Sequence, residues 1–346
     1  MSKVKLLWGL TKVLLPDGMT RFLYGTRLPV VDGRRIDAKA QAASELVDLL
    51  RDSSEMPSLE ESRAQLDKLA EKLDRPCPAE VVKTDVMLPG AFGERRARIY
   101  TLPGSDPKAA QPTVLFLHGG GWVQGSIASH AGLCGWIAKG AGVRVISYDY
   151  VLAPEHKWPA APDDVLAVYT ALLEGAAGLG VTADQLVVAG DSAGANLTAV
   201  LMHDLAEAGR SMPAGQVLIY PSVDGRLESA SMRSLAEQPL LPRVRIGWFL
   251  DHYLPEGQDR TVPRISPLFS PNLAGQPPAF VIAGGHDPLW DDGCAYVKAL
   301  TGAGVPVQFN PYEGQVHAFL SLTRIMGQGR QAMDEINDWL RLRFSQ

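Results

Sequence analysis

The chain has 346 residues, of which 46% are hydrophobic and 21% are charged, and its formal net charge is −5. This composition suits one large domain with an appendage, and the mild acidity excludes the basic face that a nucleic-acid-binding protein needs. Three cysteines without a Cys-x-x-Cys pair argue against a disulfide framework and a structural zinc site. We therefore expect a cytoplasmic protein that holds no metal.

The first predicted helix lies at the N-terminus and ends at Pro16. Its leucines recur at helical spacing, whereas Lys12 interrupts the apolar run and no small-residue cleavage site follows, which disfavours a signal peptide. No apolar stretch reaches the ~20 residues of a membrane span, so we expect no transmembrane segment. Two roles stay open for this helix: packing as part of a lid, or weak interfacial contact with a membrane.

Residues 36–75 continue the helical pattern. Ser58 and Glu61 have the spacing of a capping box, which predicts a helix start, and Pro76 ends the pattern. We assign residues 1–75 to an N-terminal helical cap segment.

The pattern changes at about residue 80, where short runs begin to alternate with helix-length stretches. The first part, residues 81–100, alternates apolar with polar residues, as antiparallel edge strands do, and the later runs are continuously apolar. Continuous apolar runs separated by helices predict a mostly parallel central sheet with helices on both faces, an α/β architecture. A weaker run, 305–309, contains a proline that fits only a strand start or a sheet edge. The predicted buried strands are 113–117, 143–147, 185–189, 216–220 and 279–283.

One connection between predicted strands is longer than the others. Almost sixty residues separate the strands at 216–220 and 279–283, which is more than one crossover helix needs. Residues 242–253 have the pattern of an inserted helix, and we assign this insertion and the N-terminal helices to one lid over the carboxyl edge of the sheet. The predicted organisation is cap segment 1–75, core 76–221, cap insertion 222–264 and core 265–346.

The residues Gly190-Asp191-Ser192-Ala193-Gly194 follow a predicted strand and open a helical stretch. This is the context of the Gly-x-Ser-x-Gly elbow, in which a tight turn exposes a serine above the sheet and the glycines leave room for it. The amides at the helix N-terminus favour an anion there. We predict Ser192 as the nucleophile, although the pattern by itself also fits an ordinary strand–turn–helix junction.

A serine nucleophile needs a base and an acid that orients it. Asp287 follows the predicted strand 279–283, and His317 follows the weaker run, so both lie at carboxyl ends of strands, where α/β sheets bind ligands. The order nucleophile, acid, histidine is that of the α/β hydrolases. Asp291 and Asp292 are the nearest rivals of Asp287, but they lie further into the next helix.

The segment His118-Gly119-Gly120-Gly121-Trp122 directly follows a strand. Its glycines can present unobstructed amides, which acyl transfer needs for the oxyanion. We predict Gly120, Gly121 and Ala193 as the oxyanion hole and a structural role for His118. The alternative is a merely flexible connection.

These motifs together resemble the hormone-sensitive-lipase-like branch of the α/β hydrolases, over roughly residues 80–346 and less over 1–75. Residues 150–156, Tyr-Val-Leu-Ala-Pro-Glu-His, resemble a further signature of this branch, with Val151 in place of its usual arginine. Ala318 stands where the family commonly has glycine after the histidine. The resemblance also implies that Glu155 belongs to a structural network under the active site.

The resemblance implies an α/β-hydrolase fold and a carboxylesterase for short- to medium-chain acyl esters, with no metal or organic cofactor. Its partner is then a small-molecule ester, and a homodimer is compatible. Trp122, Trp248 and Phe249 are candidate walls of the substrate pocket, with ordinary lid packing as the alternative.

The predicted mechanism is serine esterase chemistry through an acyl-enzyme, with the catalytic triad Ser192, Asp287 and His317. Amide, lactone or acetyl-group hydrolysis on the same machinery stays open, because the leaving group is selected by the lid. A binding protein that has lost catalysis is the alternative from another class, and the intact triad disfavours it.

Overall fold

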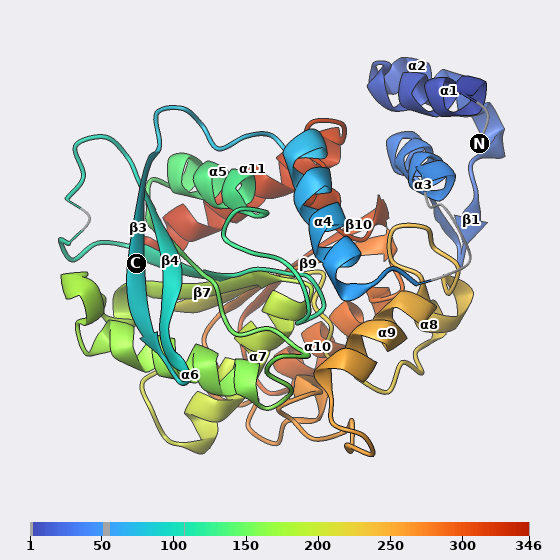
Figure 1. Cartoon of the computed structure of the whole chain (residues 1–346). Coiled ribbons are helices and arrows are strands. Elements are labelled where there is room, and N and C mark those ends of the chain that lie inside the picture. Colours follow the sequence, from blue (N-terminus) through green and yellow to red (C-terminus); the bar gives the residue numbers. More distant parts are fainter. Residues whose placement is uncertain (1–2, 51–55, 107, 346) are drawn as a thin grey trace.

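A computed structural model describes residues 3–50, 56–106 and 108–345 (Figure 1). Its strands are β1 Val30–Val31, β2 Arg34–Arg35, β3 Val82–Gly90, β4 Gly93–Thr101, β5 Thr113–Leu117, β6 Arg144–Tyr148, β7 Leu186–Asp191, β8 Gly215–Ile219, β9 Ala279–His286 and β10 Val307–Val316. Its helices are α1 Lys3–Leu14, α2 Asp17–Tyr24, α3 Ala38–Leu50, α4 Leu59–Leu73, α5 Ala131–Ala141, α6 Ala160–Leu173, α7 Ala193–Glu207, α8 Ala230–Ser234, α9 Arg243–Tyr253, α10 Trp290–Gly302 and α11 Gly327–Phe344.

Strands β3 to β10 form one eight-stranded sheet in the order β10-β9-β8-β7-β5-β6-β4-β3. The pairs from β6 through β10 are parallel, whereas β3 pairs antiparallel with β4, and β4 antiparallel with β6. The predicted mostly parallel sheet and the antiparallel character of residues 81–100 are thus confirmed. The weak run at 305–309 becomes the longer β10, and its Pro311 is tolerated because β10 is an edge strand.

Helices cover both faces of this sheet (Figure 1). Successive side chains of a strand point to opposite faces. In β5, Val114 and Phe116 therefore join the core under α5 and α11, whereas Leu115 and Leu117 join the core under α6 and α7. Because β5 and β7 are buried on both faces, their sequences are continuously apolar and not alternating, apart from Thr113 at the start of β5 and Asp191 at the end of β7.

The N-terminal segment divides into two parts. Helices α1 and α2 pack on α3 (Figure 1), whereas α4 is joined to the inserted helix α9 by a hydrogen bond from Arg245 to Ser62. The predicted helical stretch 36–75 is two helices, and residues 51–55 between them lie outside the described residues. The inserted helix predicted at 242–253 is confirmed as α9. Among the described helices, none combines the length and apolarity required to cross a bilayer.

Candidate active site

The strand β7 and the helix α7 meet at Ser192, which has φ 53° and ψ −115°. This left-handed conformation costs on the order of 1–3 kcal/mol in a residue with a side chain. The neighbouring glycines are required sterically. A Cβ on Gly190 would lie 2.4 Å from the backbone of Gly194, and a Cβ on Gly194 would lie 1.9 Å from the Leu117 carbonyl oxygen. The elbow therefore forms only with glycine at both positions.

The predicted base and acid lie within hydrogen-bond distance of this serine and of each other. His317 Nε2 is 3.0 Å from Ser192 Oγ, and His317 Nδ1 is 2.6 Å from Asp287 Oδ2. The second carboxylate oxygen of Asp287 accepts a 2.9 Å bond from the Leu289 amide, which holds it in position. Asp287 is only 1% exposed, so water does not weaken its bond to the imidazole.

The two rival carboxylates have other partners, and so has His286, the residue before Asp287. The Asp291 carboxylate accepts a hydrogen bond from the Ser231 amide at the start of α8. Asp292 accepts bonds from two amides of the loop after β8, and burial raises the pKa of its carboxyl to about 8. His286 Nε2 lies 3.0 Å from the Arg34 carbonyl oxygen in the N-terminal segment. These three side chains are parts of loop connections and not of the Ser192 cluster.

Ala318 adopts a left-handed conformation with φ 61°. Glycine reaches this region without strain, which accounts for the family's preference at this position. In this protein the alanine adopts the strained conformation, and His317 keeps its position beside Ser192 and Asp287. Tyr220, which sequence reasoning missed, packs its ring 4.7 Å from the imidazole and restricts its orientation.

The glycine loop after β5 follows a path that side chains would block. Gly120 has φ 122°, and a Cβ there would lie 2.2 Å from the Gln124 carbonyl oxygen. A Cβ on Gly121 would lie 2.3 Å from the Phe249 ring of α9. Among the described residues, no protein acceptor bonds the amides of Gly120, Gly121 or Ala193. These amides are available to an oxyanion.

A buried polar network lies under the elbow. Asp191 Oδ1 accepts a 2.7 Å bond from the Gly119 amide and lies 3.2 Å from His130 Nε2. His118 stacks on Tyr150, whose hydroxyl donates to the His118 carbonyl oxygen. Burial lowers the pKa of the His118 imidazole to about 3, which keeps it neutral. The network ties the glycine loop to the strand that carries the serine.

The Asp191–His130 pair predicts a pH-dependent stability. Burial opposes the charge on each partner, but their mutual attraction raises the pKa of His130 and, with the bond from Gly119, lowers the pKa of Asp191. The contribution of the Asp191 carboxylate to the free energy of unfolding is fully present above its ordinary pKa of ~3.9 and is lost as the pH falls through the lowered value. The contribution of His130 is present below ~6.5 and is lost as the pH rises through the raised value.

We therefore expect Asp191→Asn to lower the free energy of unfolding by about 3 kcal/mol near pH 5.5, and by less near pH 9. Urea denaturation at the two pH values measures this. The control is Asp85→Asn, which breaks a more exposed pair with Arg98 and should cost less than about 1 kcal/mol. A loss from Asp191→Asn that is the same at both pH values would contradict the assignment.

Helix α4 connects the cap insertion to the glycine loop. Ser62 Oγ donates to the Gln124 side-chain carbonyl and accepts from the Arg245 guanidinium of α9. Sequence reasoning missed this bridge, because Ser62 and Arg245 are 183 residues apart in the chain.

The next residue of α4, Arg63, donates to the Val123 carbonyl oxygen at 2.9 Å and pairs with Glu155 at 2.7 Å. The Glu155 side chain is 52% exposed. Glu155 therefore holds Arg63 against the glycine loop from the solvent side, and the expectation that Glu155 lies under the active site is wrong. No local sequence signal marks Arg63.

The three predicted pocket residues occupy different environments. The Phe249 ring lies directly against Gly121 of the glycine loop. Trp122 is 3% exposed and stacks on Tyr253 of α9 at 4.6 Å, so it joins the cap to the core. Trp248 is half-buried, packs edge-on against the Phe249 ring at 5.4 Å and has the Arg245 guanidinium over its own ring. Phe249 is thus the member of this set with a direct contact to the glycine loop.

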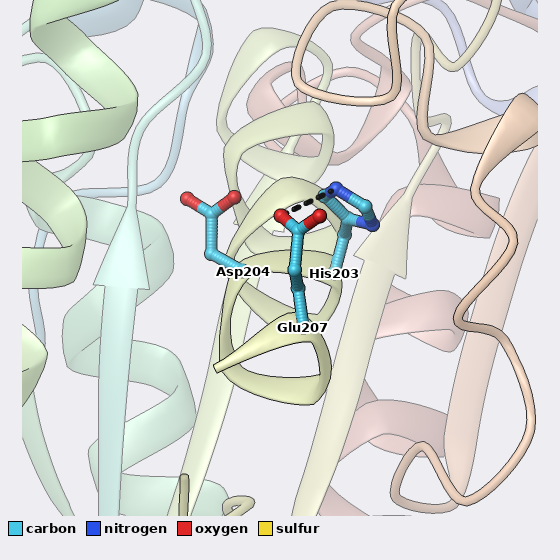
Figure 2. Close-up of side chains that lie close together, drawn as sticks. All are labelled: His203, Asp204 and Glu207. Atoms are coloured by element: carbon cyan, nitrogen blue, oxygen red, sulfur yellow. Dashed lines mark ion pairs between the residues drawn. The ribbon is translucent and has the colours of Figure 1, made fainter. Parts of the chain in front are cut away.

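One group of side chains in the described part of the chain has the spacing of a metal site, namely His203, Asp204 and Glu207 of α7. Figure 2 shows His203 and Glu207 joined as an ion pair, with Asp204 to one side of them and outside that pair. The Asp204 carboxylate instead lies 3.0 Å from the Arg264 guanidinium. His203 is also eleven residues beyond Ser192, roughly 16 Å along the helix. This cluster is therefore separate from the serine and its partners.

Comparison with known proteins places this geometry in a family. Residues 114–321 match the family described as alpha/beta hydrolase fold, and the chain belongs to that family. It is 35% identical over 342 residues to the carboxylic ester hydrolase LipN of Mycobacterium tuberculosis, covering 96% of this chain and 89% of that protein. It is 38% identical to an ethyl acetate hydrolase of Pseudomonas putida, over 68% of this chain and 74% of that protein.

One solved structure is similar to this chain over most of the length of both proteins. An ester hydrolase from the metagenome of Lake Arreo, complexed with a derivative of bipyridine phosphonate, aligns with a TM-score of 0.84 and 36% identity, covering 89% of this chain and 98% of that one. Fold and relatives together define the protein as an enzyme, a serine hydrolase of the carboxylic ester hydrolase class.

Proposed function

We propose that the protein hydrolyses short- to medium-chain acyl esters with Ser192 as nucleophile, His317 as base and Asp287 as its orienting acid. The observation that supports this proposal most directly is the pair of distances, 3.0 Å from Ser192 Oγ to His317 Nε2 and 2.6 Å from His317 Nδ1 to Asp287 Oδ2. A phosphonate bound to the similar Lake Arreo ester hydrolase fits serine chemistry.

In the proposed reaction, Ser192 Oγ attacks the ester carbonyl carbon while His317 Nε2 accepts its proton. Asp287 fixes the imidazole tautomer and stabilises its cation. The amides of Gly120, Gly121 and Ala193 receive the oxyanion. His317 then protonates the departing alcohol, and a water molecule, activated by the same imidazole, releases the acid and restores Ser192.

The proposed chain-length preference rests on how closely the cap meets the glycine loop. A single Cβ on Gly121 would already collide with Phe249, so this ring closes the space directly beside Gly121, and we infer that it limits the length of the acyl chain. We expect kcat/KM for nitrophenyl esters to be highest between acetate and octanoate and to fall at least about tenfold by palmitate. A maximum at palmitate would show a lipase-like pocket instead.

Phe249→Ala tests this wall. Removal of the ring opens space beside Gly121, so the ranking of acyl lengths should move toward longer chains by roughly tenfold in relative kcat/KM. Trp248→Ala should shift it less, because Phe249 and not Trp248 is in contact with Gly121. The matched control is Val244→Ala on the exposed side of the same helix, where the side chain is 65% exposed. An unchanged ranking in Phe249→Ala would place the pocket elsewhere.

A cytoplasmic location is proposed on the state of the thiols. Cys77, Cys134 and Cys294 are all free in the structure. Free thiols of this kind persist where glutathione keeps the compartment reducing.

A further inference from the structure

The exposed apolar side chains of this protein are concentrated at its N-terminal end. In the described part of the chain, fourteen large apolar side chains are exposed, and half of them fall within residues 4–22. Single exposed apolar residues are ordinary, but a cluster of this density indicates an interaction surface. The members of this N-terminal apolar patch are Val4, Leu7, Trp8, Leu10, Leu14, Met19 and Phe22.

Only one side of α1 is needed for the fold. Val13 is buried, and Gly9 faces Leu46 and Leu49, so this side packs on α3. The opposite side is also apolar, with Leu7 68% exposed. A helix with apolar side chains on two opposite sides is normally covered on both of them. In this chain α3 covers one side, and α1 and α2 lie at the periphery, on the far side of α3 from the sheet (Figure 1).

The charge of this segment differs from that of the whole protein. Residues 1–28 carry five basic side chains and one acidic side chain, Asp17, although the net charge of the chain is −5. A symmetric contact between two copies would place this cationic surface against itself, which is unfavourable. An anionic surface complements it. The basic residues are Lys3, Lys5, Lys12, Arg21 and Arg27. Lys12 pairs with Glu45 of α3, so the charge argument rests on Lys5, Arg21 and Arg27, which are exposed.

We propose that α1 and α2 dock on an anionic lipid bilayer, lying in the plane of its interface. The apolar patch enters the boundary between headgroups and acyl chains, with Phe22, 86% exposed, and Leu14, 74% exposed, among its main anchors. Lys5 and Arg21, both exposed, meet the lipid phosphates. This contact is independent of the chemistry at Ser192, and it holds an ester hydrolase where apolar esters accumulate.

Co-sedimentation of the full chain with vesicles tests the proposal. We expect binding to phosphatidylcholine vesicles that contain phosphatidylglycerol, at least about tenfold weaker binding to phosphatidylcholine alone, and weakening by half-molar salt. Leu7→Gln and Phe22→Gln should each lower binding roughly tenfold. The matched control is Leu342→Gln on α11, which is 63% exposed and should bind like the unchanged protein. All three positions face solvent, so the variants should keep the thermal stability of the unchanged chain.

Two further variants test whether the basic side chains and the catalytic serine contribute to vesicle binding, separately from the insertion of apolar side chains into the bilayer. Lys5→Glu combined with Arg21→Glu should weaken binding to the anionic vesicles and leave the binding to phosphatidylcholine alone unchanged. Ser192→Ala should bind vesicles like the unchanged protein, so a failure of the esterase proposal is recognised separately. The lipid proposal is overturned if the protein does not bind vesicles, or if Leu7→Gln and Leu342→Gln lose binding equally. It is also overturned if light scattering shows a dimer that Phe22→Gln dissociates and the protein does not bind vesicles.

Discussion

Ser192→Ala should reduce kcat for a butyrate ester by about 10⁶-fold, because the members of a serine triad act as a unit and loss of the nucleophile removes the acyl-enzyme route. The change deletes one half-buried hydroxyl, whose partner in the protein is His317 Nε2. Alanine, like serine, has a Cβ, so the backbone strain at φ 53° is unchanged. The variant should therefore unfold at the same temperature as the unchanged enzyme.

Steady-state kinetics and labelling by a fluorophosphonate probe measure this result together. The probe should label the unchanged enzyme and leave Ser192→Ala unlabelled. Ser105→Ala, which changes an exposed serine in the loop after β4, is the matched control and should keep full activity and labelling. A variant that retained a tenth of the activity would remove Ser192 from the role of nucleophile.

Asp287→Asn should lower kcat by about 10⁴-fold while the protein stays folded, since an amide at this position favours the wrong imidazole tautomer. The carboxylate is 2.6 Å from His317 Nδ1 and 1% exposed, so neither water nor a neighbouring side chain replaces it. The expected loss lies in kcat, because Asp287 acts on the base and not on the bound ester.

Asp291→Asn is the matched control for this change. The Asp291 carboxylate binds the Ser231 amide at the start of α8, so its removal should lower the unfolding temperature slightly and leave kcat within about threefold. Kinetics and thermal unfolding of both variants separate the two effects. Equal losses of kcat, or the larger loss in Asp291→Asn, would reverse the assignment of the acid.

Much of the site could be predicted because its signals are local. The glycines around Ser192 are required by contacts within one strand–turn–helix junction, and a motif of five residues records that requirement. Asp287 and His317 follow strands whose apolar runs are visible in the sequence. Parallel strands bring their carboxyl ends to one edge of the sheet, so the order of these strands was enough to predict that the three residues share an edge.

The cap was harder to predict. Residues 1–75 and the later insertion were assigned to one lid, and those boundaries stay a prediction. In the structure, α4 bridges to α9 through Ser62 and Arg245, whereas α1 and α2 pack on α3 at the periphery. Both groups are amphipathic helices in the sequence. Helical periodicity reports that a face is apolar but not which partner covers it.

The sequence by itself determined the α/β architecture, the elbow at Ser192 and the order of the three proposed triad residues, because each depends on backbone sterics or on strand periodicity over a few residues. Only the tertiary structure decided which side chains support these groups. The bond from Gly119 to Asp191 spans 72 residues, and that from Arg63 to Val123 spans 60. Such contacts depend on how the packed elements meet in space, and no local pattern encodes that arrangement.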